Sequence, residues 1–410
     1  MNPPIPPEVL RELELLVTAF VFMMGACIGS FLNVVIWRLP RGESLSHPGS
    51  HCPKCNHPLA VWQNVPILGW LVLRGRCFYC KAPISVRYPV VELFTALLFT
   101  AVWAGIAHAG LPWASTVRYL FMAGVLLAAA VIDAEHGIIP DKLVVTGLLA
   151  ALAIPAVLPG SIHFPGCAGH GAECLHDSIP LPAFSWLQPG TAGFALLTSL
   201  LGMAAGGAFM ASARVLGTVF WGRRDVALPE AESAVSFGPG GLRIGGAASV
   251  ALDELIGPRH EACELRMVRG QLEWRGEDGA VRNRDIRKTI VRLDDEGAEV
   301  GDLFVPASAI LSLEGTASRA WRSREVLGLG DVKLTAMIGA FLGPLAVLCV
   351  ILFSSLAAMV AGCLALPFRR GSGGSLPYGP YLSLAAICVF FFWNDLVLWI
   401  GHVILAAFMH

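Results

Sequence analysis

Four cysteines in two pairs are the residues of this chain whose spacing most clearly predicts chemistry. They lie in HCPKCNHPL and GRCFYC, with two residues inside each pair and 21 residues between the pairs. Such spacing is typical of a tetrahedral zinc site, which four thiolates close so that no position remains for catalysis. A disulfide pair is the weaker alternative in a reducing compartment. The spacing therefore predicts a structural zinc ion bound by Cys52, Cys55, Cys77 and Cys80.

The histidines beside the first pair, His51 and His57, could replace a thiolate, although solvated loop histidines are the simpler interpretation. The other cysteines of the apolar and charged segments are expected to pack as small apolar residues. They are Cys27, Cys263, Cys349, Cys363 and Cys388.

Two aspartates at the ends of apolar runs are the second candidate for chemistry. Asp133 ends a run in AAAVIDAEHGIIPDKL, and Asp331 begins one in LGLGDVKLTAMIGA. Asp331 could simply cap a helix, whereas Asp133 would lie at a helix C-terminus, where the dipole disfavours an anion. Two nearby carboxylates share one proton, as aspartic proteolysis requires. From these residues alone, a catalytic pair and an ion or proton pathway are equally supported.

Composition indicates a multi-pass membrane protein. The 410 residues are 55% hydrophobic and 14% charged, and the mean hydropathy is +0.65, unlike an ordinary soluble domain. We expect an all-α polytopic fold of about eight transmembrane helices, the sixth of them short. The N-terminus lacks a basic region, so we expect no cleavable signal peptide. The predicted spans are Leu15–Trp37, Val90–His108, Val117–Ile132, Leu143–Leu158, Thr191–Phe220, Val332–Leu342, Leu345–Leu366 and Tyr381–Phe408.

The basic residues predict the orientation. Seven Lys and Arg residues against the single Glu43 between Arg38 and Arg87 indicate a cytoplasmic loop. Eight crossings then place 133–142, 221–331 and 367–379, and with them both aspartates, in the cytoplasm. Segment 159–190 contains no Lys or Arg and would lie outside. Its Cys167 and Cys174 could pair or remain free thiols.

Charge is concentrated in segment 222–326, which contains 33 of the 59 charged residues. Short alternating runs broken by Gly, Asp and Pro predict a small β-rich soluble module there, with an interaction or regulatory role. Its 15 basic and 18 acidic residues nearly cancel, so we expect no nucleic-acid binding. The predicted organisation is a first span at 1–37, a zinc loop at 38–89, spans two to five at 90–221, the module, and spans six to eight at 327–410.

Five motifs in order resemble those of the prepilin leader peptidases, membrane aspartic proteases that process type IV pilins and type II secretion pseudopilins. The first is GSFLNVVIWRLPRGESL at Gly29–Leu45, and the second is CPKC with the segment that continues to Phe99. DAEHGIIPDKL and GLGDVKL resemble the two aspartate motifs, and LPYGPYLSLAA resembles the closing motif. The insertion 222–326 departs from the family, whose loop before the second aspartate motif is much shorter.

The resemblance implies a bacterial inner-membrane enzyme that cleaves a short basic leader after a glycine on the cytoplasmic side. Asp133 and Asp331 would be the catalytic pair. Gly328 and Gly330 would permit close backbone approach, and Lys333 would tune Asp331, contact substrate or snorkel. Many members also methylate the new N-terminal residue, commonly phenylalanine, with S-adenosylmethionine, for which this sequence has no glycine-rich fingerprint.

Partners implied by the resemblance are prepilins or pseudopilins, membrane lipid, and pilus or secretion components that bind 222–326. Two other functions remain open: an ion-coupled transporter with a zinc-stapled loop, and an assembly scaffold. Near the aspartates, Glu135 and His136 are interpreted as solvated and Asp141 as a helix cap after Pro140.

Overall fold

The computed structural model divides the chain into two compact units. The structure describes residues 7–162, 191–226, 233–238, 241–244, 262–276, 279–293, 297–323, 327–365 and 377–408. The first unit is formed by Met1–Met210, Leu329–Phe368 and Leu376–His410, and the second by Ala211–Gly328 and Arg369–Ser375. Cys167 and Cys174 lie outside the described residues, so their pairing stays open.

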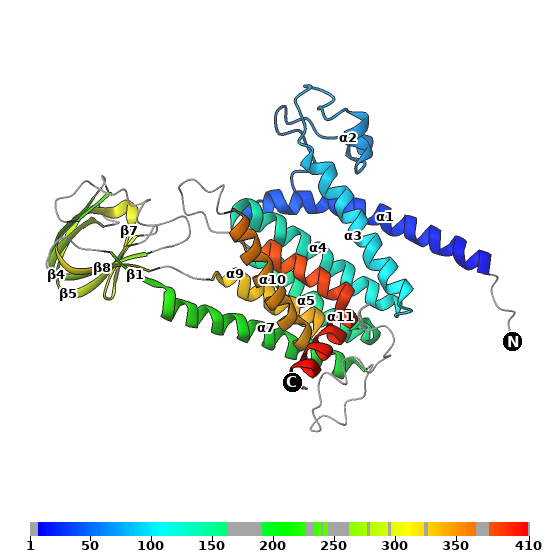
Figure 1. The fold of residues 1–410 in the computed structure, drawn as a ribbon. Helices are drawn as coiled ribbons and strands as arrows, with labels where there is room; N and C mark the ends of the chain where they lie inside the picture. Colours follow the sequence, from blue (N-terminus) through cyan, green and yellow to red (C-terminus); the bar gives the residue numbers. More distant parts are fainter. Residues whose placement is uncertain are drawn as a thin grey trace. The chain divides into compact units, whose positions relative to one another are not determined.

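The first unit is a helical bundle, drawn as coiled ribbons in Figure 1. Each of the eight predicted spans overlaps one of its long helices, and α7 continues into the second unit. Short helices η1 (Leu39–Arg41), η2 (Val61–Asn64), α2 (Leu68–Val72) and η3 (Pro159–Ile162) lie in connections. The long helices are α1 (Pro7–Arg38), α3 (Arg87–His108), α4 (Trp113–His136), α5 (Asp141–Val157), α7 (Ala192–Trp221), α9 (Leu329–Leu342), α10 (Pro344–Ala365) and α11 (Gly379–Phe408).

Five of these helices are long and apolar enough to cross a membrane: α1, α3, α4, α7 and α10. Three others are shorter in their apolar part. Helix α5 has 17 residues and α9 has 14, and α11 has a non-helical residue at Phe392. The structure thus confirms a mostly helical chain with five helices that could span a membrane, while the count of eight spans remains a prediction.

Helix α9 has only 14 residues, and most of its side chains are buried inside the bundle. It crosses α7 at two glycines: a Cβ on Gly202 would lie 1.9 Å from the Gly339 carbonyl oxygen, and one on Gly339 would lie 2.1 Å from that of Gly202. Small residues permit such backbone contact between membrane helices. Close packing against α7 thus holds α9, the helix whose first turn contains Asp331, in place.

A buried arginine in α4, Arg118, bonds to α5, α7 and α9. Its guanidinium donates to the carbonyl oxygens of Ala151 in α5 and of Ala340 and Phe341 in α9, at 2.7 to 3.2 Å, and to Ser199 Oγ in α7 at 3.1 Å. Ala340 and Phe341 lie in the last turn of α9, whose carbonyls lack intrahelical partners and favour a cation. In α5 the Ala151 carbonyl lacks its partner because Pro155 has no N–H. Arg118 therefore fixes α4, α5 and α9 about 22 Å along α4 from Asp133.

The second unit contains the predicted β structure, an antiparallel sheet of eight strands (Figure 1). The order is β3-β2-β8-β4-β5-β6-β7, and β1 also pairs with β8. Buried aliphatic side chains such as Leu265 and Leu313 form a separate hydrophobic core. The strands are β1 (Arg223–Val226), β2 (Ser233–Gly238), β3 (Gly241–Ile244), β4 (Ala262–Arg275), β5 (Val281–Leu293), β6 (Gly297–Val300), β7 (Leu303–Pro306) and β8 (Ile310–Ser323).

Charges in segment 222–326 nearly cancel in number but not in position. Exposed arginines oppose each other across neighbouring strands, Arg266 with Arg319 and Arg269 with Arg287. Like charges directly opposite each other are destabilising. The register thus concentrates positive charge at the middle of the three longest strands, β4, β5 and β8. The small net charge of the segment does not reveal this concentration.

Candidate active site and metal centre

Asp133 lies in the last turn of α4 and is 4% exposed. Gly137, with a φ of 67°, ends the helix, and its N–H bonds to the Asp133 carbonyl oxygen at 2.8 Å. The side chain of Asp133 has a partner of its own: the N–H of Gly379 donates to carboxylate Oδ2 at 2.7 Å. Gly379 begins α11, so its N–H is one of those that lack an intrahelical partner. The positive end of α11 thus offsets the unfavourable dipole of α4.

Gly379 also permits the closest approach in the site. A Cβ at this position would lie 2.8 Å from Asp133 Oδ2 and 3.1 Å from Asp133 Cβ. The sequence contained one signal for this role, a glycine followed by proline at the start of an apolar run, because proline favours the first turn of a helix. We identified LPYGPYLSLAA as a motif but did not predict that Gly379 contacts Asp133.

Asp331 lies in the first turn of α9 and is 8% exposed. A carboxylate there is favoured by the dipole of its own helix. The preceding glycine, Gly330, packs on the segment between α4 and α5, since a Cβ on it would lie 3.1 Å from Ile139 Cβ. Ile139 follows Asp133 by six residues. The structure therefore places the first turn of α9 against the segment that leaves the Asp133 helix, while Gly328 lies exposed before α9.

Lys333 forms an ion pair with Asp141, with 2.6 Å between Nζ and Oδ1. Both side chains are substantially exposed. The prediction that Asp141 caps α5 is wrong: Pro140 is at the N-cap position, and Asp141 is the first helical residue. The ion pair connects the first turns of α5 and α9. The partner of Lys333 is thus Asp141 and neither Asp133 nor Asp331.

Glu135 is exposed, as expected, and it also forms an ion pair. Its carboxylate pairs with Arg87, with 2.9 Å between Nη1 and Oε2. Arg87 is the first residue of α3. This pair attaches the end of the cysteine-containing loop to the last turn of α4, two residues beyond Asp133.

The four predicted cysteines form one cluster, whose sulfur atoms all lie within 4.8 Å of one another. Cys52 Sγ lies 3.8 Å from Cys80 Sγ, about the edge of a tetrahedron with Zn–S bonds of 2.3 Å. All four cysteines are free, so the disulfide alternative does not apply in this structure. His51 contacts the Gly49 carbonyl oxygen and His57 stacks on Tyr79, so the donor set consists of sulfur alone.

The thiols differ in acidity before any metal binds. Hydrogen bonds from the backbone amides of Cys80 and Tyr79 lower the pKa of Cys77 to about 6. The His57 amide lowers the pKa of Cys55, but desolvation and the other three sulfurs outweigh it and raise that pKa to about 11. A bound dication deprotonates coordinating thiols outright.

The remaining cysteines of the described segments differ in burial. Cys263 is buried in the core of the sheet, and Cys349 packs against the helical core. Cys27, Cys363 and Cys388 are exposed on the apolar helices α1, α10 and α11.

Two segments of the chain match known families. Residues 23–106 match the bacterial peptidase A24 N-terminal domain, and residues 300–363 match the type IV leader peptidase family. The first match contains all four clustered cysteines, and the second contains Asp331. The resemblance to the prepilin leader peptidases is confirmed.

Curated relatives agree with these two matches. The prepilin leader peptidase/N-methyltransferase of Myxococcus xanthus is 46% identical over 34% of this chain and 40% of its own length. The enzyme of the same name from Klebsiella pneumoniae is 41% identical over 36% of this chain and 65% of its own length. The type 4 prepilin-like proteins leader peptide-processing enzyme of Escherichia coli is 39% identical over 36% of this chain and 61% of its own length. The chain spans about half the length of these relatives. No solved structure matches it.

Proposed function

We propose that this chain is a membrane aspartic endopeptidase that removes the leader peptide of type IV prepilins or type II secretion pseudopilins. The observation that carries the proposal is a pair of buried aspartates on adjoining helix ends in a chain similar to prepilin peptidases. The enzyme would lie in the bacterial inner membrane with both aspartates on the cytoplasmic side. The excess of basic residues between Arg38 and Arg87 supports that orientation.

Hydrolysis would use the two carboxyl groups in different protonation states. The ionised group removes a proton from a water molecule, whose oxygen then bonds to the scissile carbonyl carbon. The protonated group donates its proton to the carbonyl oxygen. When the C–N bond breaks, the first carboxyl group gives the proton it took from water to the leaving amine, and the second regains its proton as the carbonyl re-forms. Because Asp133 Oδ2 accepts the Gly379 hydrogen bond, a proton shared by the pair would lie on Asp133 Oδ1 or on Asp331.

We assign a structural role to the cysteine cluster. Its four sulfurs fit a zinc ion in spacing and in chemistry, and zinc would close the loop without taking part in hydrolysis. Metal analysis of the purified full chain should give one zinc per molecule, and the double variant Cys52→Ser, Cys77→Ser should contain none. Metal-free wild-type protein, purified without chelators, would contradict the assignment.

Methyl transfer is proposed from the names of the relatives alone. S-adenosylmethionine would supply the methyl group for the new N-terminal residue. The described residues provide no identifiable binding set for it, so no residue of this chain is assigned to that reaction.

A single experiment tests the proposal. Purified protein is incubated with a prepilin, with and without S-adenosylmethionine, and the products are weighed by mass spectrometry. Loss of the leader mass supports the peptidase, and a further gain of one methyl group supports the transferase. An unchanged prepilin, together with ion-dependent flux in reconstituted vesicles, would instead support the transporter.

A further inference from the structure

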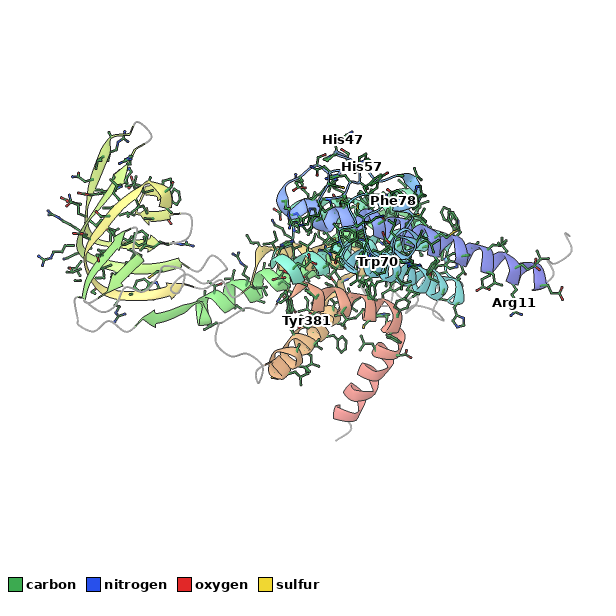
Figure 2. The ribbon with its side chains drawn as sticks, turned by 90° about the horizontal axis from the view of Figure 1, so that it is seen from above. Arg11, His47, His57, Trp70, Phe78 and Tyr381 are labelled. Carbon is green, nitrogen blue, oxygen red and sulfur yellow. The ribbon has the colours of Figure 1, made fainter. Side chains whose placement is uncertain are left out.

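The segment between α1 and α3 contains a pocket of about 530 Å³ beside the cysteine cluster. Three of its lining side chains are cationic and none is acidic. Phe78, one of its apolar walls, is labelled in Figure 2, and Figure 1 shows that the segment with α2 projects from the helical bundle. The lining residues are Val72, Leu73, Arg74, Arg76, Cys77, Phe78 and Lys81.

The positive charge of this pocket is not compensated by the residues that the structure describes. The side chains of Arg74 and Arg76 are exposed and make no hydrogen bond or ion pair with the described part of the chain. Lys81 donates to the Phe78 carbonyl oxygen at 2.8 Å and lies over the Phe78 ring. A pocket with two unpaired guanidinium groups fits an anion that can accept several hydrogen bonds, as phosphate does.

The two arginines are held in place by a tight turn. A Cβ on Gly75 would lie 2.8 Å from the Trp70 ring, and Gly75 has a φ of +67°. The Trp70 indole N–H in turn donates to the Ile84 carbonyl oxygen at 3.1 Å. Arg74 itself has a φ of +51°, a conformation that is strained for a side chain of this size. The turn thus presents both guanidinium groups from a rigid base.

The pocket adjoins an exposed apolar surface on α2. Leu68, Leu71 and Val72 are 60%, 55% and 69% exposed. The segment is connected at both ends to helices that can cross a membrane, α1 and α3. Apolar side chains beside cations are typical of a surface that rests in the headgroup region of a bilayer.

We propose that this pocket binds the phosphate of an anionic phospholipid while Leu68, Leu71 and Val72 insert among its acyl chains. The bound lipid holds the cysteine-containing loop on the bilayer surface. The bilayer is the favoured source of the phosphate because both ends of the loop enter it, which keeps lipid headgroups at high local concentration. The proposal does not depend on proteolysis.

Native mass spectrometry of the full-length protein tests the site. Detergent-purified protein is titrated with phosphatidylglycerol or with phosphatidylcholine that has the same acyl chains. Arg74→Gln and Arg76→Gln should each weaken phosphatidylglycerol binding roughly fivefold, and the triple variant with Lys81→Gln roughly a hundredfold, since each cation contributes about one decade or less. Phosphatidylcholine binding should be unchanged.

Arg41→Gln is the matched control because Arg41 lies in the same segment but stacks on Trp37, outside the pocket. Retained metal content in the triple variant shows that the loop is folded. The proposal is overturned if wild type retains both lipids equally, if the triple variant keeps wild-type affinity, or if Arg41→Gln weakens binding as much. Competition by glycerol 3-phosphate at lipid-like concentrations would show that the site takes free phosphate and would overturn the lipid assignment.

Discussion

The two buried aspartates lie at helix ends of opposite polarity. Asp133 occupies the last turn of α4, where the helix carries partial negative charge, and Asp331 occupies the first turn of α9, where it carries partial positive charge. Asp331 is thus favoured by its own helix. Asp133 requires a donor from elsewhere, and the Gly379 amide at the start of α11 provides it.

This difference shows that a third helix belongs to the candidate active site. Helices α4 and α9 carry the carboxyl groups, but α11 supports the one in the less favourable position. Changes at α11 should therefore affect the site through Asp133, whereas changes beside α9 should have smaller effects.

The largest effect is expected at the carboxyl groups themselves. Asp133→Asn and Asp331→Asn should each lower the rate of leader cleavage by about three orders of magnitude or more, because neither acid can replace the other in general acid–base catalysis. Initial rates by mass spectrometry on membrane-inserted protein measure this. Substantial cleavage by either variant would remove the catalytic pair from the proposal.

Gly379→Ala should have the next largest effect. Its new Cβ would meet Asp133 Oδ2 at 2.8 Å, and displacement of a reacting group by about 1 Å can cost on the order of a hundredfold in rate. The matched control is Gly124→Ala, another glycine of the bundle, at which a Cβ makes only ordinary contact with Phe99, at 3.7 Å. Equal rates for the two variants would mean that α11 does not position Asp133.

Gly330→Ala should have a moderate effect, beside the better-placed aspartate. The added Cβ would lie 3.1 Å from Ile139 Cβ, so the loop must move by a few tenths of an ångström, and we expect a loss of roughly tenfold or less. The same cleavage assay measures it. A larger loss of cleavage rate than that of Gly379→Ala would mean that the surroundings of Asp331 matter more than those of Asp133.

Lys333→Gln should have the smallest effect. Its ion pair with Asp141 is exposed, and such pairs contribute about 0.2–1 kcal/mol, or roughly a fivefold change at most. Asp141→Asn removes the same pair from the other side and should match it in thermal stability and cleavage rate. A far greater loss for Lys333→Gln alone would indicate that Lys333 contacts substrate or Asp331.

Several features were predictable because they depend on local spacing. Two CxxC pairs identify a four-cysteine cluster wherever the loop folds, since the residues of each pair are already neighbours. Long apolar runs predict membrane helices by length alone. Alternating polar and apolar residues likewise predicted the sheet of the second unit. Helix α9 was predicted as a short span, but its burial could not be predicted, because that depends on contacts with α7 that no local pattern shows.

The sequence by itself determined the cysteine cluster, the apolar helices and the identity of the two aspartates. The tertiary structure decided which groups surround those aspartates. The Gly379–Asp133 hydrogen bond joins residues 246 positions apart, and the Lys333–Asp141 pair joins residues 192 positions apart. Hydrogen bonds and ion pairs act over only a few ångströms, so these partners exist only after helix packing has brought the ends of α4, α5, α9 and α11 together.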